Sequence, residues 1–176
     1  MLTMFLIISG VLLRLIPHVP NFAPVSATAI FAGVYLNKKL ALLIPLITMA
    51  VSDYLLSPTA MFHSTTFYVW GSLMISGSIG LWLKKRKKPI FIIGASLFAS
   101  LQFFLITNFG VWATGMYDRG LDGLIQSYIM GIPFYRWTLL GDLFYTTVFF
   151  TSFFLLSNSF KISKIVILNK LIRTKR

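Results

Sequence analysis

The chain has no cysteine, no glutamate and only four acidic residues among its 176 positions. Without cysteine it cannot form a disulfide, a thiolate metal site or a cysteine nucleophile. Charged residues amount to 11% of the sequence, whereas a soluble domain averages about 25%. These shortages exclude a soluble enzyme, a disordered tail and, despite a net charge of +12, a nucleic-acid-binding protein.

Apolar residues are abundant instead: they make up 57% of the chain and give a mean hydropathy of +0.82. Charged residues and prolines divide the sequence into six apolar runs, at 2–16, 22–36, 40–52, 67–83, 89–113 and 137–157. A helix needs roughly 20 apolar residues to cross a membrane. The pattern predicts an all-α integral membrane protein in which residues 1–159 form one domain of six transmembrane helices. The first run has neither a basic start nor a small-residue cleavage site, so we expect it to be retained rather than cleaved as a signal peptide.

The basic residues are distributed unevenly over the predicted connections. Thirteen of the sixteen Lys and Arg residues fall at 38–39, at 84–88 and within 160–176. Because cytoplasmic loops are enriched in Lys and Arg, we predict that both termini are cytoplasmic. Residues 160–176 alternate apolar and basic positions, which predicts a basic amphipathic cytoplasmic tail on the membrane surface or, alternatively, against a cytoplasmic partner.

Polar residues that can carry chemistry gather on the predicted outer side. The outer connections hold both histidines and three of the four acids of the chain. Their candidate residues are His18, Asn21, Asp53, His63, Tyr117, Asp118, Arg119, Asp122 and Arg136. Ionisable groups near the hydrocarbon cost about 2.5–3.5 kcal/mol each, so those that persist are paired or functional. We expect Asp53 to pair with Arg136 across the bundle, either as a structural pair or as part of a ligand site.

Two ionisable residues lie inside apolar runs. Arg14 has two open interpretations: its charged group extends to the membrane interface, or it is kept as a paired or functional group. Asp142 is the acid expected to lie within the membrane, against a hydroxyl, an asparagine or an arginine of the bundle. Residues 121–130 are expected to form a short helix that ends at Gly131 and Pro133. That helix would lie across the outer mouth, either as a lid over a pocket or as an interfacial structural helix.

His63 precedes a run of hydroxyl and aromatic residues at the mouth of an outer helix. Such a histidine can line a pocket and bind a borderline metal such as cobalt, and the alternative is a loop histidine bonded to the backbone. The sequence contains no H-E-x-x-H, G-x-S-x-G or P-loop motif. We therefore expect no enzymatic activity and no cofactor of its own.

Five segments together carry a resemblance to a known family. They are RLIPHVPNFAP at 14–24, SD at 52–53, FHSTTFY at 62–68, NFGVW at 108–112 and IPFYRWTLLGD at 132–142. These segments resemble small bacterial membrane proteins related to the substrate-binding S components of energy-coupling-factor (ECF) transporters. The resemblance implies a bundle of six helices with cytoplasmic termini, an outward-facing pocket, and a location in the bacterial cytoplasmic (inner) membrane. The nearest understood type is the solitary cobalamin-transporting S component.

The resemblance also implies a set of binding residues. Positions that recur in the cobalamin type fall on His18, Asp53, Tyr68 and Arg136, and Asn21 and Asn108 complete the expected pocket. The cobalamin type uses a cysteine as the lower axial ligand of cobalt, and His63 lies near the matching place here. Cobalamin is therefore a candidate substrate, with His63 as the candidate axial ligand.

The expected function is uptake of a vitamin or cofactor precursor, with the small molecule and the lipid bilayer as partners. S components dock an ECF energising module through an Ala-x-x-x-Ala stripe on the first helix. Residues 2–16 lack that stripe, which favours a solitary transporter. One alternative is an interaction or assembly subunit without a small-molecule ligand. A third is a membrane-embedded metal-dependent enzyme that uses Asp118 with Asp122, or His18 with His63.

Overall fold

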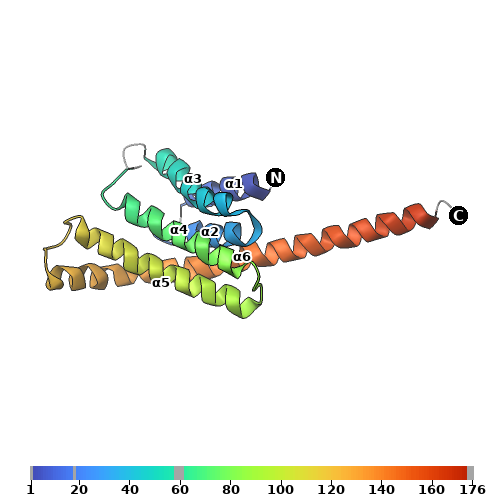
Figure 1. Ribbon diagram of the computed structural model, residues 1–176. Helices are drawn as coiled ribbons and strands as arrows, with labels where there is room; N and C mark the ends of the chain where they lie inside the picture. Colours follow the sequence, from blue (N-terminus) through green and yellow to red (C-terminus); the bar gives the residue numbers. More distant parts are fainter. Residues whose placement is uncertain (1, 18, 58–61, 174–176) are drawn as a thin grey trace.

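The computed structural model describes residues 2–17, 19–57 and 62–173, with the side chains of 2–4, 6, 7 and 158–173 outside the description. The secondary structure in this part of the chain is helical throughout (Figure 1). The helices are α1 (Leu2–Leu15), α2 (Val25–Tyr35), α3 (Lys38–Leu56), α4 (Thr66–Leu83), α5 (Pro89–Ala113) and α6 (Leu121–Arg173).

Four of these helices are long and apolar enough to cross a membrane: α3, α4, α5 and residues Leu121–Ser157 of α6. The prediction of an all-helical membrane protein is thus confirmed in its coarse form. The other two helices are short, since α1 has 14 residues and α2 has 11, against the roughly 17–25 residues of a full span.

The last helix differs most from expectation. The predicted short helix over 121–130 and the predicted span over 137–157 are parts of one continuous helix, α6, which passes through Gly131 and Pro133. A proline inside a helix removes one backbone hydrogen bond. Ending the helix within an apolar bundle would leave several backbone groups without partners, so the continuous helix is favoured. The helix also continues unbroken across the predicted domain boundary at 159 and 160.

Helix α2 lies at the centre of the bundle and contacts each of the other five helices. All of its residues except Tyr35 are buried. Glycines allow its close approach to α4, since a Cβ atom at Gly80 would lie 2.9 Å from the Cα of Gly33. Small residues at such crossings are typical of packed membrane helices. On the side of α6, rings of both helices form an aromatic cluster, in which Tyr35 and Phe153 have centroids 4.1 Å apart.

The bundle has two distinct ends. One end, which we call the basic end, carries Lys38, Lys39 and the basic loop 84–88. Here the loop between α4 and α5 contacts the end of α2. Lys84 Nζ donates to the carbonyl oxygen of Leu36 at 3.0 Å, and Lys87 Nζ lies 4.6 Å from the ring centroid of Tyr35. Helices α3 and α5 end, and helices α4 and α6 begin, at the opposite end. Figure 1 shows α5 and the start of α6 extending beyond the other helices at the opposite end, and the far part of α6 leaving the bundle at the basic end.

Candidate functional site

The segment that joins α1 to α2 places the start of α2 inside the bundle. Prolines at 17, 20 and 24 prevent the chain from continuing as one helix. A turn closes where the Phe22 amide donates to the Val19 carbonyl oxygen at 3.0 Å. Asn21 adopts a positive φ of 68° there, a conformation that asparagine tolerates better than most residues. The chain just before α2 packs against α6, since a Cβ atom at Gly141 of α6 would lie 3.1 Å from the Phe22 Cα.

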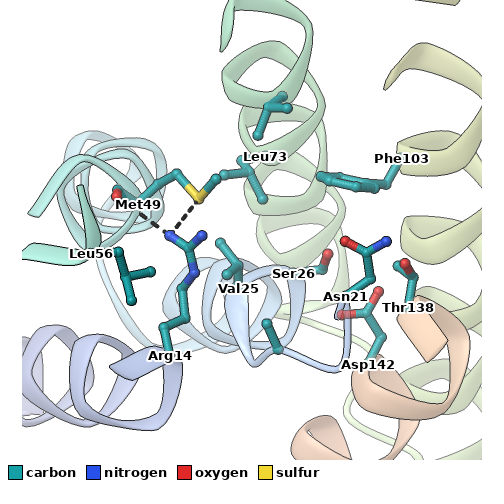
Figure 2. A pocket seen from close by; sticks show the side chains of 12 residues that line it. Arg14, Asn21, Val25, Ser26, Met49, Leu56, Leu73, Phe103, Thr138 and Asp142 are labelled. Carbon is teal, nitrogen blue, oxygen red and sulfur yellow. Dashed lines mark hydrogen bonds between the residues drawn. The ribbon is translucent and has the colours of Figure 1, made fainter. Parts of the chain in front are cut away.

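A cavity of about 180 Å³ lies beside this buried helix start. Figure 2 shows Arg14 of α1 at one side and Asp142 of α6 at the other, with Val25 of α2 between them. The remaining polar lining comes from Asn21, Ser26 and Thr138. Apolar residues, among them Met49, Leu73 and Phe103, complete the walls.

A second cavity of about 260 Å³ adjoins the first. Both are lined by Asn21, Met49, Val69, Phe103 and Thr138. The second cavity is also lined by Asn108, which lies close to the end of α5. This cavity therefore extends away from the basic end of the bundle. Asn108 packs against Gly131, where a Cβ atom would lie 2.7 Å from the Asn108 Cγ. A side chain larger than hydrogen at Gly131 would displace Asn108.

Arg14 forms an ion pair with Asp53 of α3. The distance from Arg14 Nη1 to Asp53 Oδ1 is 2.8 Å, and the two side chains are 15% and 11% exposed. The same nitrogen donates to Ser52 Oγ and to Met49 Sδ. Arg14 thus lies on the face of α1 that packs against α3, and its charge is paired there. The physical reason is that α1 runs alongside α3 in the same direction, which brings residue 14 level with residue 53.

Asp142 is a carboxyl group with no cationic partner in the described residues. Its side chain is 1% exposed and accepts a hydrogen bond from Ser100 Oγ at 2.8 Å. The Ser26 hydroxyl, in the first turn of α2, is its second hydrogen-bond partner. The positive end of the α2 dipole favours a negative group at this place. As predicted, Asp142 is the acid buried within the apolar bundle and meets hydroxyl groups there.

The structure brings some of the predicted site residues together. Asn21 lines both cavities and Asn108 lines the second. Asp53 reaches the first cavity through Arg14, and not through Arg136 as expected. Arg136 is exposed on α6. Tyr68 packs against Gly110 and lies 6.2 Å from the Phe109 ring, outside the residues that line the two cavities.

The two histidines do not enter this arrangement. His63 is exposed just before α4, and its backbone amide donates to Thr66 Oγ1 at 2.9 Å. Its ring Nδ1 lies 3.3 Å from the same oxygen, which resembles the alternative of a locally bonded loop histidine. His18 lies outside the described residues. Among the residues searched, no group of three His, Cys, Asp or Glu side chains is close enough to hold a metal ion.

Sequence reasoning missed two polar lining residues, Ser26 and Thr138, and also Ser100, which donates to Asp142. Each is a hydroxyl-bearing residue in an apolar run, where serine and threonine often bond only to the preceding turn of their own helix. The usable signal was the pair of charged residues inside apolar runs, Arg14 and Asp142. Both line the first cavity.

Comparison with known proteins adds a family assignment to this geometry. No curated protein matches the chain, and no solved structure does. Residues 1–165 match the family described as "Family of unknown function (DUF6580)". The match covers nearly the whole sequence, and the chain belongs to that family.

Proposed function

We propose that this chain is a multi-pass protein of the bacterial cytoplasmic membrane that takes up a small organic solute by binding it in the two adjoining cavities. The observation that carries the proposal is the placement of Arg14 and Asp142 at two sides of one cavity within an apolar bundle. Charged groups at such depth are costly and persist where they pair or bind something. Asp142 has no cationic partner in the described part of the chain.

The topology that we propose has six membrane crossings with both termini in the cytoplasm. The basic end carries Lys38, Lys39 and 84–88, which supports placing it inside. Helices α1 and α2 then form a short, interrupted pair of crossings. Transporters use interrupted helices of this kind near the membrane midplane, where helix ends and free backbone groups face a solute. With the basic end inside, the cavities face outward.

The lining suggests the chemistry of the solute. Arg14 contacts the other described residues through Nη1. Within that part of the chain its remaining nitrogens can donate to a carboxylate or another acceptor of the solute. Asp142 suits a protonated amine or another donor. The cavities, of about 180 and 260 Å³, suit a compact solute. A vitamin or cofactor precursor of that size fits this description, and the S-component interpretation continues to rest on the resemblance of the motifs.

The proposal is tested by mass spectrometry of small molecules that co-purify with the protein in detergent. Asp142→Asn keeps the size of the side chain but removes its charge. We expect the compound that the wild type retains to fall about tenfold or more in this variant, because a lost charged contact costs more than about 1.4 kcal/mol. Asp122→Asn, an exposed position at the start of α6, is the matched control. Equal retention by both variants, each eluting as a folded species, would refute the assignment of the cavity.

Cobalamin is tested separately by its visible absorption after incubation and desalting. We expect a colourless protein, because a corrin with its axial ligands is far larger than either cavity and His63 does not line them. The opposite result has a clear meaning. Retained corrin whose shifted bands disappear in His63→Ala would support cobalamin as the substrate, with His63 on cobalt, and would require the bundle to open widely.

One observation favours a second candidate, an assembly subunit. Helix α6 continues past the bundle to Arg173, which gives a partner a helical surface (Figure 1). Deleting residues 160–176 would abolish a specific complex under this function and would leave solute retention unchanged under the first.

A further inference from the structure

A third cavity lies away from the proposed solute site, on the exposed surface of the bundle between α4 and α5. It is a groove of about 530 Å³. Its walls are almost wholly apolar, with Ile75, Ile79 and Trp82 from α4 and Ile90, Phe91 and Phe98 from α5. Because Trp82 is near the end of α4 and Ile90 near the start of α5, the groove reaches the basic end of the bundle. It is suited to an apolar chain that enters from the membrane.

Glycine creates the depth of this groove. A Cβ atom at Gly94 would meet no other atom within 4 Å, so the space in front of this residue is open. Ser78 also lines the groove, but its hydroxyl donates to the Met74 carbonyl oxygen at 2.9 Å. The hydroxyl is therefore satisfied within its own helix. An occupant of the groove needs no polar group at this depth.

Five consecutive basic residues, 84–88, connect α4 to α5 directly at the mouth of the groove. Lys84 and Lys87 are engaged with the end of α2. The Arg86 guanidinium lies 4.6 Å from the ring centroid of Trp82, one of the lining residues. Lys85 and Lys88 are exposed.

No acidic residue of the chain lies near this loop in sequence or at this end of the bundle. Asp53 is paired with Arg14, Asp142 lies by α2, and Asp118 and Asp122 belong to the opposite end. The charge at the mouth of the groove is therefore not balanced by the described part of the protein. An anionic group from outside would balance it.

We propose that the groove between α4 and α5 binds an anionic phospholipid, with an acyl chain along Gly94 and the phosphate against Arg86 and the neighbouring lysines. An apolar slot that ends in a basic cluster matches a molecule with an apolar chain and a negative head. A second protein helix would fill the slot but would leave the cations unbalanced. The charge thus favours lipid over a second copy of the chain.

The test uses the full-length protein in detergent, mixed with phosphatidylglycerol or phosphatidylcholine of identical acyl chains. Bound lipid is counted by native mass spectrometry. We expect the wild type to retain phosphatidylglycerol at least about fivefold more than phosphatidylcholine. Gly94→Phe should remove that excess by filling the groove. Gly71→Phe is the matched control, because a Cβ atom at this α4 position also meets nothing within 4 Å.

A second variant separates the head group from the acyl chain. Replacing Lys85, Arg86 and Lys88 together with alanine should equalise the two lipids without closing the groove. Replacing Lys38 and Lys39, at the same end of the bundle, should leave the preference intact. Equal binding of the two lipids by the wild type, or undiminished phosphatidylglycerol on Gly94→Phe, would overturn the proposal. A dimer that Gly94→Phe dissociates would overturn it in favour of a second copy of the chain.

Discussion

Replacing Gly80 with leucine should destabilise the bundle by about 3 kcal/mol or more, at the upper end of overpacking effects. A Cβ atom at Gly80 would collide with the carbonyl oxygen of Ile30 and lie 2.9 Å from the Cα of Gly33. Both obstacles are backbone atoms of α2, which contacts all the other helices and cannot shift without disturbing each of them. Unfolding in detergent, followed by circular dichroism, measures the loss.

Gly71→Leu provides the control for this experiment. It places the same side chain in the same helix, where a Cβ atom meets nothing within 4 Å. We expect it to unfold close to the wild type, within the small effect of helix propensity. If the two variants unfolded at the same temperature, the close crossing of α2 and α4 at Gly33 and Gly80 would be incorrect.

Replacing Asp53 with alanine should cost about 3–5 kcal/mol, because it leaves the Arg14 guanidinium in a mostly buried position without its counter-ion. The same unfolding measurement applies, with Asp122→Asn as an exposed control. The double variant Arg14→Met with Asp53→Ala should recover a large part of the loss, since it removes the unpaired charge as well. A double variant no more stable than Asp53→Ala would contradict the coupling of the two residues.

The pairing of Arg14 with Asp53 could not be predicted from the sequence. Arg14 and Asp53 were both recognisable as costly in an apolar chain, but their partnership depends on α1 and α3 lying side by side in the same direction. No spacing in the sequence encodes that neighbourhood, because the two residues belong to different helices. Arg136 was the expected partner of Asp53 and lies exposed instead.

Helix boundaries were predictable where a chemical break coincides with the end of an apolar run. Helix α5 begins at Pro89, after five cations, and ends at Ala113, both as predicted. Helix α6 was mispredicted because Gly131 and Pro133 would end a helix in water. In an apolar bundle the competing cost of unpaired backbone groups is greater, and the helix continues.

The shortness of α2 determines how a charged solute would experience the membrane voltage. Its eleven residues span about 16 Å, roughly half of a hydrocarbon core of about 30 Å. In the proposed topology the cavities face outward, and once water enters them the electrical potential falls mostly across this shorter distance. An ion that reaches Arg14 and Asp142 has then crossed little of the field. Its binding should be nearly independent of voltage, whereas its passage to the basic end should carry most of the roughly 2.3 kcal/mol per charge and 100 mV.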